Sequence, residues 1–248
     1  MILLALLGCL DRLLESPYVL ATGLGDVRSV APSTDGRLWV AASTGVYAID
    51  GEGRAERIEE APALAVASHP DRTYVLRDGR VTWGGGAGLD APGAVDILGG
   101  HDALVVLYPD HYERIGPGDP SGAPRHLARL GGTLDARAVA LGPDGGWIVV
   151  SEHALQNVGA DGAVTTVIDG LVDARAAVVD VKGRIYVAQG DPQELWRVDP
   201  GAPSPLVSVA RWLGDPKDLH FGVGGLLATE NTYVANGAGT LEYVRPPP

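Results

Sequence analysis

The chain has 248 residues, of which 46% are hydrophobic and 20% are charged, a balance that fits one folded domain and excludes an intrinsically disordered protein. Its 31 acidic and 19 basic residues give a net charge of −12, which argues against nucleic-acid binding because phosphate contacts need a basic surface. Frequent glycine (35) and proline (18) argue against long helices, and the single cysteine, Cys9, excludes an intramolecular disulfide and a multi-cysteine metal site.

An apolar run, Met-Ile-Leu-Leu-Ala-Leu-Leu-Gly, opens the chain and ends at Cys9. It is too short to span a bilayer, which takes roughly 20 apolar residues. The segment from Leu6 to Cys9 resembles the bacterial lipobox, in which a small residue precedes a cysteine that becomes lipidated. The alternative is an N-terminal helix with Cys9 as a small core residue. We favour an exported envelope lipoprotein, with residues 1–16 as the signal or helix and 17–248 as one domain; the alternative location is the cytoplasm.

A repeated pattern fills the rest of the chain. A short β-branched run leads through a turn such as Asp-Gly or Lys-Gly into a run with an aromatic residue, as in Thr34–Ala41, Pro143–Val149 and Lys182–Val187. Six units begin near Arg28, Leu64, Ala94, Arg137, Arg175 and Pro216, at spacings of roughly 30 to 43 residues. One unit cannot bury both faces of its sheet, so the units must pack against one another.

The Asp-Gly-x-Leu/Ile-aromatic-Val core, followed by Val-x-x-Ile-Asp, resembles the NHL-repeat and gluconolactonase-like six-bladed β-propellers over roughly residues 17 to 245. This resemblance implies an all-β fold of six four-stranded antiparallel blades. Tyr18–Asp26 parallels the outer strand and exit of later units, so we expect the N-terminal strand to complete the last blade. Leu241–Arg245 can be aligned with a third or a fourth strand, and we favour the third.

In such propellers, the loops that enter each innermost strand and the loops that join the second and third strands share the face where ligands usually bind. An Asp-x-Arg or Asp-x-Lys pattern places the following cations on this face in four of six units: Arg28, Arg137, Arg175 and Lys217. One interpretation is a ring of structural ion pairs, and the other is a set of donors for a carboxylate or phosphate. The second loop type adds the candidate ligand-binding residues Asp110, Asp191 and Glu230.

Two histidines on these loops follow a carboxylate, His111 after Asp110 and His153 after Glu152. A histidine oriented by a carboxylate can act as a general acid or base, which makes His111, Glu152 and His153 the candidate catalytic residues. Adjacent strand residues point to opposite sides, however, so neither pair is self-contained, and solvated turn residues are the simpler interpretation. The Gly84–Gly88 run leads into no helix pattern and is interpreted as a linker between blades.

Aromatic residues at repeated strand positions are expected between the blades, namely Trp39, Tyr74, Trp147, Tyr186 and Trp196. Trp83 and Trp212 fall outside the strict repeat and are expected at the surface. The gluconolactonase-like enzymes hold a divalent metal through glutamate, asparagine and aspartate, but this chain has only three asparagines and no Pro-Asn-Gly segment before an inner strand. We therefore expect no cofactor, with calcium at the channel as the alternative.

The sequence thus predicts a monomeric, non-catalytic propeller that binds a protein partner or a small anionic ligand at the loop face. Membrane contact is expected only through a lipid on Cys9. The alternative is a hydrolase or lyase of the gluconolactonase-like or streptogramin-lyase-like type that acts at the same face.

Overall fold

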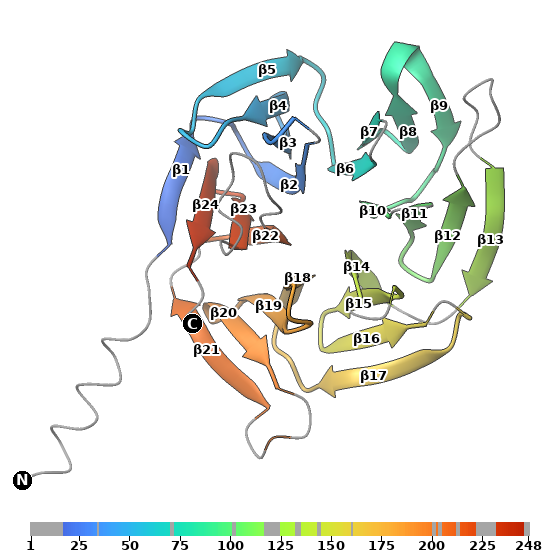
Figure 1. Cartoon of the computed structure of the whole chain (residues 1–248), viewed down its shortest axis with the longest axis vertical. Helices are drawn as coiled ribbons and strands as arrows, with labels where there is room; N and C mark the ends of the chain where they lie inside the picture. The colour runs from blue at the N-terminus through green and yellow to red at the C-terminus, as the bar shows by residue number, and fades with distance from the viewer. Residues whose placement is uncertain are drawn as a thin grey trace, which may run out of the picture.

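The computed structural model of the chain is a ring of six four-stranded antiparallel sheets (Figure 1). The structure describes residues 17–33, 35–69, 72–100, 103–116, 125–131, 135–142, 145–159, 161–199, 202, 205–211, 214–221 and 232–245. The signal or helix predicted for residues 1–16, with Cys9, lies outside this part of the chain, as do Trp212 and Glu230. Within it, no helix has the length and hydropathy needed to cross a membrane.

Each blade is built from strands that are consecutive in the chain, except that the last blade also takes the first strand. Blade 1 contains β2 (Val27–Pro32), β3 (Leu38–Ala42), β4 (Gly45–Ile49) and β5 (Ala55–Glu59); blade 2 contains β6 (Ala65–His69), β7 (Arg72–Arg77), β8 (Arg80–Trp83) and β9 (Ala87–Asp90); blade 3 contains β10 (Asp96–Gly99), β11 (Leu104–Leu107), β12 (His111–Gly116) and β13 (Arg125–Gly131). Blade 4 contains β14 (Ala136–Leu141), β15 (Trp147–Ser151), β16 (Ala154–Val158) and β17 (Val164–Asp169); blade 5 contains β18 (Ala174–Val179), β19 (Ile185–Gly190), β20 (Gln193–Val198) and β21 (Leu206–Arg211); blade 6 contains β22 (Pro216–Phe221), β23 (Thr232–Asn236), β24 (Thr240–Val244) and β1 (Tyr18–Thr22). The inner strands β2, β6, β10, β14, β18 and β22 begin within two residues of the predicted unit starts.

The ring closes through the N-terminal strand, as the sequence predicted. β1 pairs antiparallel with β24, with Tyr18 opposite Tyr243 and Thr22 opposite Thr240. β24 therefore lies between β23 and β1 as the third strand of blade 6, and the favoured alignment of this segment is confirmed. Ala21 points into the hydrophobic cluster between blades 6 and 1, so closure of the ring also buries apolar surface.

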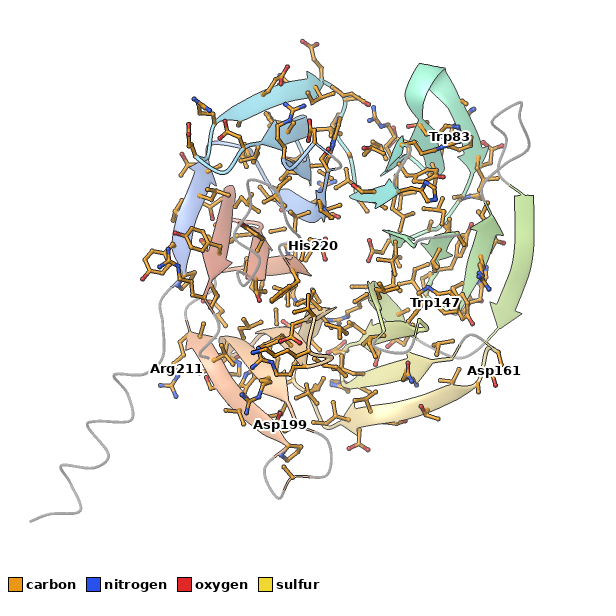
Figure 2. The ribbon with its side chains drawn as sticks, in the orientation of Figure 1. Trp83, Trp147, Asp161, Asp199, Arg211 and His220 are labelled. Carbon is orange, nitrogen blue, oxygen red and sulfur yellow. The ribbon has the colours of Figure 1, made fainter. Side chains whose placement is uncertain are left out.

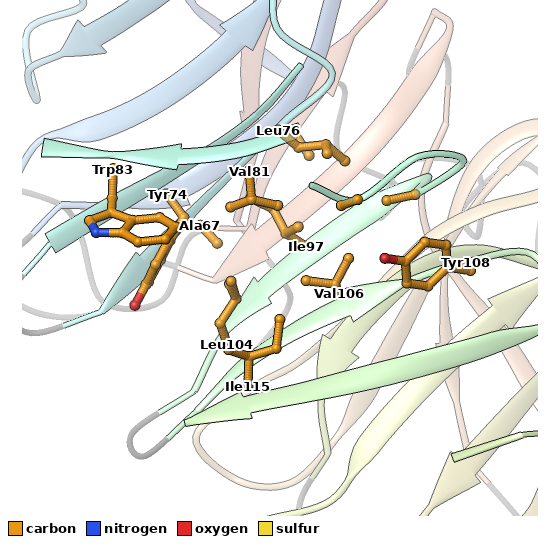
Figure 3. Packing of buried hydrophobic residues seen from close by; sticks show 13 residues of the cluster. Ala67, Tyr74, Leu76, Val81, Trp83, Ile97, Leu104, Val106, Tyr108 and Ile115 are labelled. Carbon is orange, nitrogen blue, oxygen red and sulfur yellow. The ribbon is translucent and has the colours of Figure 1, made fainter. Parts of the chain in front are cut away.

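Hydrophobic clusters between neighbouring blades form the core. One of them joins Tyr74 and Leu76 of blade 2 to Ile97 and Leu104 of blade 3 (Figure 3). The aromatic residues that the repeat assigned to the core are there: Tyr74, Trp147 and Tyr186 are buried, and Trp39 and Trp196 are partly buried against other clusters. The core is thus divided among the blade junctions, which is why a blade needs its neighbours.

Two expectations for blade 2 were wrong. Trp83 is only 8% exposed and packs edge-on against Tyr74, with ring centroids 5.8 Å apart, because it ends β8 on the side that faces blade 3. The glycine run is not a linker between blades, since a short 3-10 helix, η1 (Gly84–Gly86), connects β8 to β9 within the same sheet. Gly88 belongs to β9, where a Cβ atom would lie 2.9 Å from the Val81 carbonyl oxygen, so this glycine allows close strand pairing.

Polar side chains also tie neighbouring inner strands together. The Val66 N–H of β6 donates to Ser29 Oγ of β2 at 3.2 Å, and the Val30 N–H of β2 donates to an Asp218 carboxylate oxygen of β22 at 2.9 Å. A third bond of this kind runs from the β14 backbone to Asp96 of β10 at 3.0 Å. These bonds satisfy backbone donors on the inner edge of the ring, where no further strand can pair with them.

Candidate functional site

Charged side chains gather at the end of the ring where the inner strands begin. Arg28, Arg137, Arg175 and Lys217 are the second residues of β2, β14, β18 and β22. We call this the charged end. The turns between second and third strands lie at the same end, because the backbone N–H groups of Ser43, Gly190 and Gly237 donate to the carbonyls of Asp26, Asp173 and Asp215 just before the inner strands. The repeat therefore brings the two predicted loop types together.

Arg137 links blade 4 to blade 5. Its guanidinium contacts Glu152 of its own blade and lies 2.8 Å from Asp173 Oδ1, which precedes the inner strand of the next blade. Asp135, the aspartate two residues before Arg137 in the repeated motif, is exposed and has a left-handed backbone conformation, with φ at +43°.

Arg175 links blade 5 to blade 6. Its Nε and Nη2 donate to the two Asp173 oxygens at 2.8 and 2.7 Å, and its Nη1 lies 3.7 Å from Asp215. Lys217 Nζ then lies 2.8 Å from the other Asp215 oxygen. Together with Arg137 and Glu152, these residues form an unbroken series of alternating charges across two blade junctions.

Hydrogen bonding keeps the centre of this series ionised. The side-chain hydrogen bond from Arg175 lowers the pKa of Asp173, with a further contribution from Arg137, and burial opposes the shift. The same hydrogen bond raises the pKa of Arg175. Both groups therefore stay charged near neutral pH, as a structural ion-pair network requires.

Two glycines that the sequence analysis did not single out make room for these charges. A Cβ atom on Gly190 would lie 2.3 Å from Asp173 Oδ2 and 2.9 Å from Arg175 Nε. A Cβ atom on Gly237 would lie 2.5 Å from Asp215 Oδ2 and 2.7 Å from Lys217 Cε. Both glycines occupy the same place at the end of the second strand of their blade. A residue-by-residue alignment of units five and six would therefore have identified them as a shared feature.

A cavity of about 350 Å³ opens at the charged end, lined by Arg137, Asp173, Arg175 and Lys217. The three cationic side chains are 30 to 35% exposed, so part of each remains open to solvent despite its ion pair. Arg28 is not among the lining residues and pairs at 2.9 Å with Asp26 of its own motif. The residues needed for structural ion pairs and those needed for a cationic site therefore lie together at the charged end.

The two histidine motifs differ in their surroundings. His111 is 7% exposed, stacks on Tyr108 with ring centroids 4.2 Å apart, and lies 2.7 Å from Asp110 through Nδ1. The expectation that His111 is a solvated turn residue, separated from its neighbour's carboxylate, was therefore wrong. Asp110 precedes β12 in a turn, so strand alternation does not apply to it.

His153 fits the solvated interpretation, with a side chain that is 70% exposed. Its Nε2 lies 3.8 Å from Glu152 Oε1, and its Nδ1 lies 3.1 Å from the Leu171 carbonyl oxygen. Asp191 is exposed in the turn between β19 and β20. Among the residues that the structure describes, no three His, Cys, Asp or Glu side chains cluster closely enough to hold a metal ion.

The ring resembles several solved structures of low sequence identity. These are streptogramin B lyase (TM-score 0.65, 12% identity, covering 92% of this chain and 96% of that one), a gluconolactonase from Xanthomonas campestris (0.63, 15%, 92% and 89%) and the PQQ-bound aldose sugar dehydrogenase from Streptomyces coelicolor (0.64, 14%, 92% and 96%). No protein-family model and no curated protein matches the sequence. The chain is a six-bladed β-propeller, and identities this low show the fold alone.

Proposed function

We propose that this propeller is a binding protein whose charged end takes a small organic anion. The observation that supports the proposal is the cavity at this end, where three blades each supply one cation and only one carboxylate, Asp173, stands among the lining residues. Arginine presents a planar set of donors that matches a carboxylate or phosphate, and lysine adds a point charge.

The ion pairs favour this use of the cations. Asp173 and Asp215 hold Arg175 and Lys217 in place before a ligand arrives, so little side-chain entropy is lost on binding. The net charge of −12 repels an anion over the surface as a whole, which makes binding depend on these local donors.

The test is calorimetric titration of the purified protein with small monocarboxylates, dicarboxylates and phosphate esters. Lys217→Gln removes one lining cation with a single close partner, and we expect it to weaken binding by about tenfold. Lys182→Gln is the matched control, because Lys182 is exposed in the turn at the far end of β18. Failure of every anion to bind, or equal affinity in the two variants, would contradict the proposal.

A hydrolase or lyase acting at the same end is the second candidate. The observation in its favour is Glu152, which contacts both Arg137 and the exposed His153 and so connects an acid–base pair to the cavity. A lactone and ester screen of the wild type against His153→Ala separates the two candidates: turnover that this variant loses favours an enzyme, whereas unchanged binding without turnover favours a binding protein.

We also propose that a lipid on Cys9 holds the propeller at a bacterial envelope, on the strength of the Leu-Leu-Gly-Cys segment that ends at this residue. Mass measurement of protein extracted from membranes tests this directly. An unmodified mass for the whole chain would contradict it.

A further inference from the structure

A second cavity lies inside the ring, at the end opposite to the charged end. Its volume is about 410 Å³, and the inner strands of all six blades line it, mostly with apolar side chains such as Val30, Val139 and Phe221. Leu141, the last residue of β14, is 50% exposed and Val181, two residues after β18, is 79% exposed, and both border the cavity. The volume falls in the range of small-molecule sites.

Three carboxylates line this cavity: Asp180 is paired with Arg184 at 2.5 Å, whereas the other two come from opposite sides of the ring. Asp96 starts β10 in blade 3, and Asp218 lies in β22 of blade 6, across the ring (Figure 1). Each of these two carboxylates accepts two backbone N–H groups, one from the next residue and one from the neighbouring blade, at 2.8 to 3.0 Å. No lysine or arginine of the described ranges pairs with either of them, and Lys217 is held by Asp215.

This arrangement leaves negative charge without a counter-ion. Burial raises the pKa of Asp218 to about 6, and burial together with the charge of Asp218 raises the pKa of Asp96. Both shifts reflect the cost of a buried charge that nothing neutralises. A cation in the cavity would remove that cost.

His220 supplies an independent polar group at the same place. It lines the cavity toward the middle of the ring (Figure 2), and its Nε2 atom is buried without a hydrogen-bond partner. Burial lowers the pKa of His220 to about 4, so its imidazole is neutral near pH 7 and cannot balance the charge of the carboxylates. A buried polar atom without a protein partner in a lined cavity is available to a bound molecule.

We infer that this cavity binds a small alkylammonium ion, with the ammonium group beside Asp218, the charge of Asp96 across the ring adding to the attraction, and the hydrocarbon part against the apolar wall. The ammonium group donates hydrogen bonds to carboxylate oxygens, and its alkyl chain gains from leaving water. Unlike a metal ion, it needs no cluster of three ligands, and the described residues offer none. The apolar border at Leu141 and Val181 gives such a ligand an entrance at the end opposite to Arg137 and Arg175, and Arg184 near this border is held by Asp180.

The test is calorimetric titration with n-butylammonium chloride, with n-butanol as the uncharged analogue. We expect the wild type to bind the ammonium ion and not the alcohol. Asp96→Asn and Asp218→Asn each keep one acceptor oxygen and should weaken binding by at least about tenfold. Asp161→Asn is the matched control, because Asp161 is exposed in the turn between β16 and β17.

A further variant keeps the test decisive if the asparagine variants do not fold. Leu141→Arg changes a half-exposed residue at the border of the cavity, leaves both carboxylates in place and should repel the ammonium ion. The inference is overturned if the folded wild type binds no ammonium ion, if binding is the same in Leu141→Arg and wild type, or if calcium chloride displaces n-butylammonium.

Discussion

Asp218 makes the folding stability of the propeller depend on pH. Its folded-state pKa is about 6, above the ordinary value of 3.8, so the folded protein holds this proton more tightly than the unfolded chain does. The destabilising contribution of Asp218 is therefore complete above about pH 6 and disappears as the pH falls through about 6 toward about 4. His220 has the opposite sign, because its lowered pKa makes folding less favourable as the pH falls from its ordinary value of 6.5 to about 4.

Asp218→Asn should separate these two contributions. The variant keeps His220 but cannot ionise at position 218, so the wild type should gain stability relative to it, on the order of 2 kcal/mol, between about pH 7 and about pH 4. Urea unfolding at a series of pH values measures this difference, with Asp161→Asn as the exposed control. Parallel stability profiles for wild type and Asp218→Asn would show that the carboxylate titrates normally.

At this scale the sequence predicted the cations of the charged end, and Arg175 and Lys217 contact the aspartates of their own motifs. The contacts of Arg137 with Asp173 and of Arg175 with Asp215 join neighbouring blades, and their choice of partner depends on ring geometry. Asp96 and Asp218 were missed as a pair because they lie in different units of the repeat, Asp96 between Val95 and Ile97 and Asp218 between Lys217 and Leu219. Only a closed ring brings strands so far apart in the sequence to one cavity.

At the scale of strands, two hydroxyl groups join β2 to β6, that of Ser29 and that of Ser68, which donates to the Pro32 carbonyl oxygen. Ser29 Oγ accepts the Val66 N–H at 3.2 Å, and both residues are buried. Ser29→Ala leaves that N–H without a partner, and we expect a loss of about 1 to 2 kcal/mol in the free energy of unfolding. Thr165→Ala on β17 is the control, because Thr165 is exposed and its hydroxyl makes only a 3.5 Å contact.

Urea unfolding of the two variants measures this contribution. Equal stability would mean that water or backbone adjustment satisfies the Val66 N–H. The strands themselves were predictable, because turn glycines and aspartates separate β-branched runs in every unit. η1 and β9 were not, since a glycine-rich run that ends a blade and one that reverses within a blade have the same composition.

At the scale of the whole molecule, the ring has one closure, where the first strand joins the last sheet. The six-unit repeat predicted it because the N-terminal segment resembles an outer strand that lacks a blade of its own. β1 contributes backbone pairing with β24 and the 5% exposed Ala21 to the junction of blades 6 and 1. In every other sheet the paired strands are consecutive in the chain, so β1 is the outer strand that can be removed without cutting a loop.

A chain that starts at Gly23 lacks β1, and we expect it to lose on the order of 3 kcal/mol of stability relative to a chain that starts at Pro17. Its β24 edge, Thr240–Val244, would be free to pair with another molecule, so it should also self-associate in size-exclusion chromatography. A synthetic peptide of residues 17–22 should restore both properties, because it supplies the missing strand and covers the edge. If the chain that starts at Gly23 is monomeric and unfolds at the same temperature as the chain that starts at Pro17, the pairing of β1 with β24 is not needed for the stability of the ring.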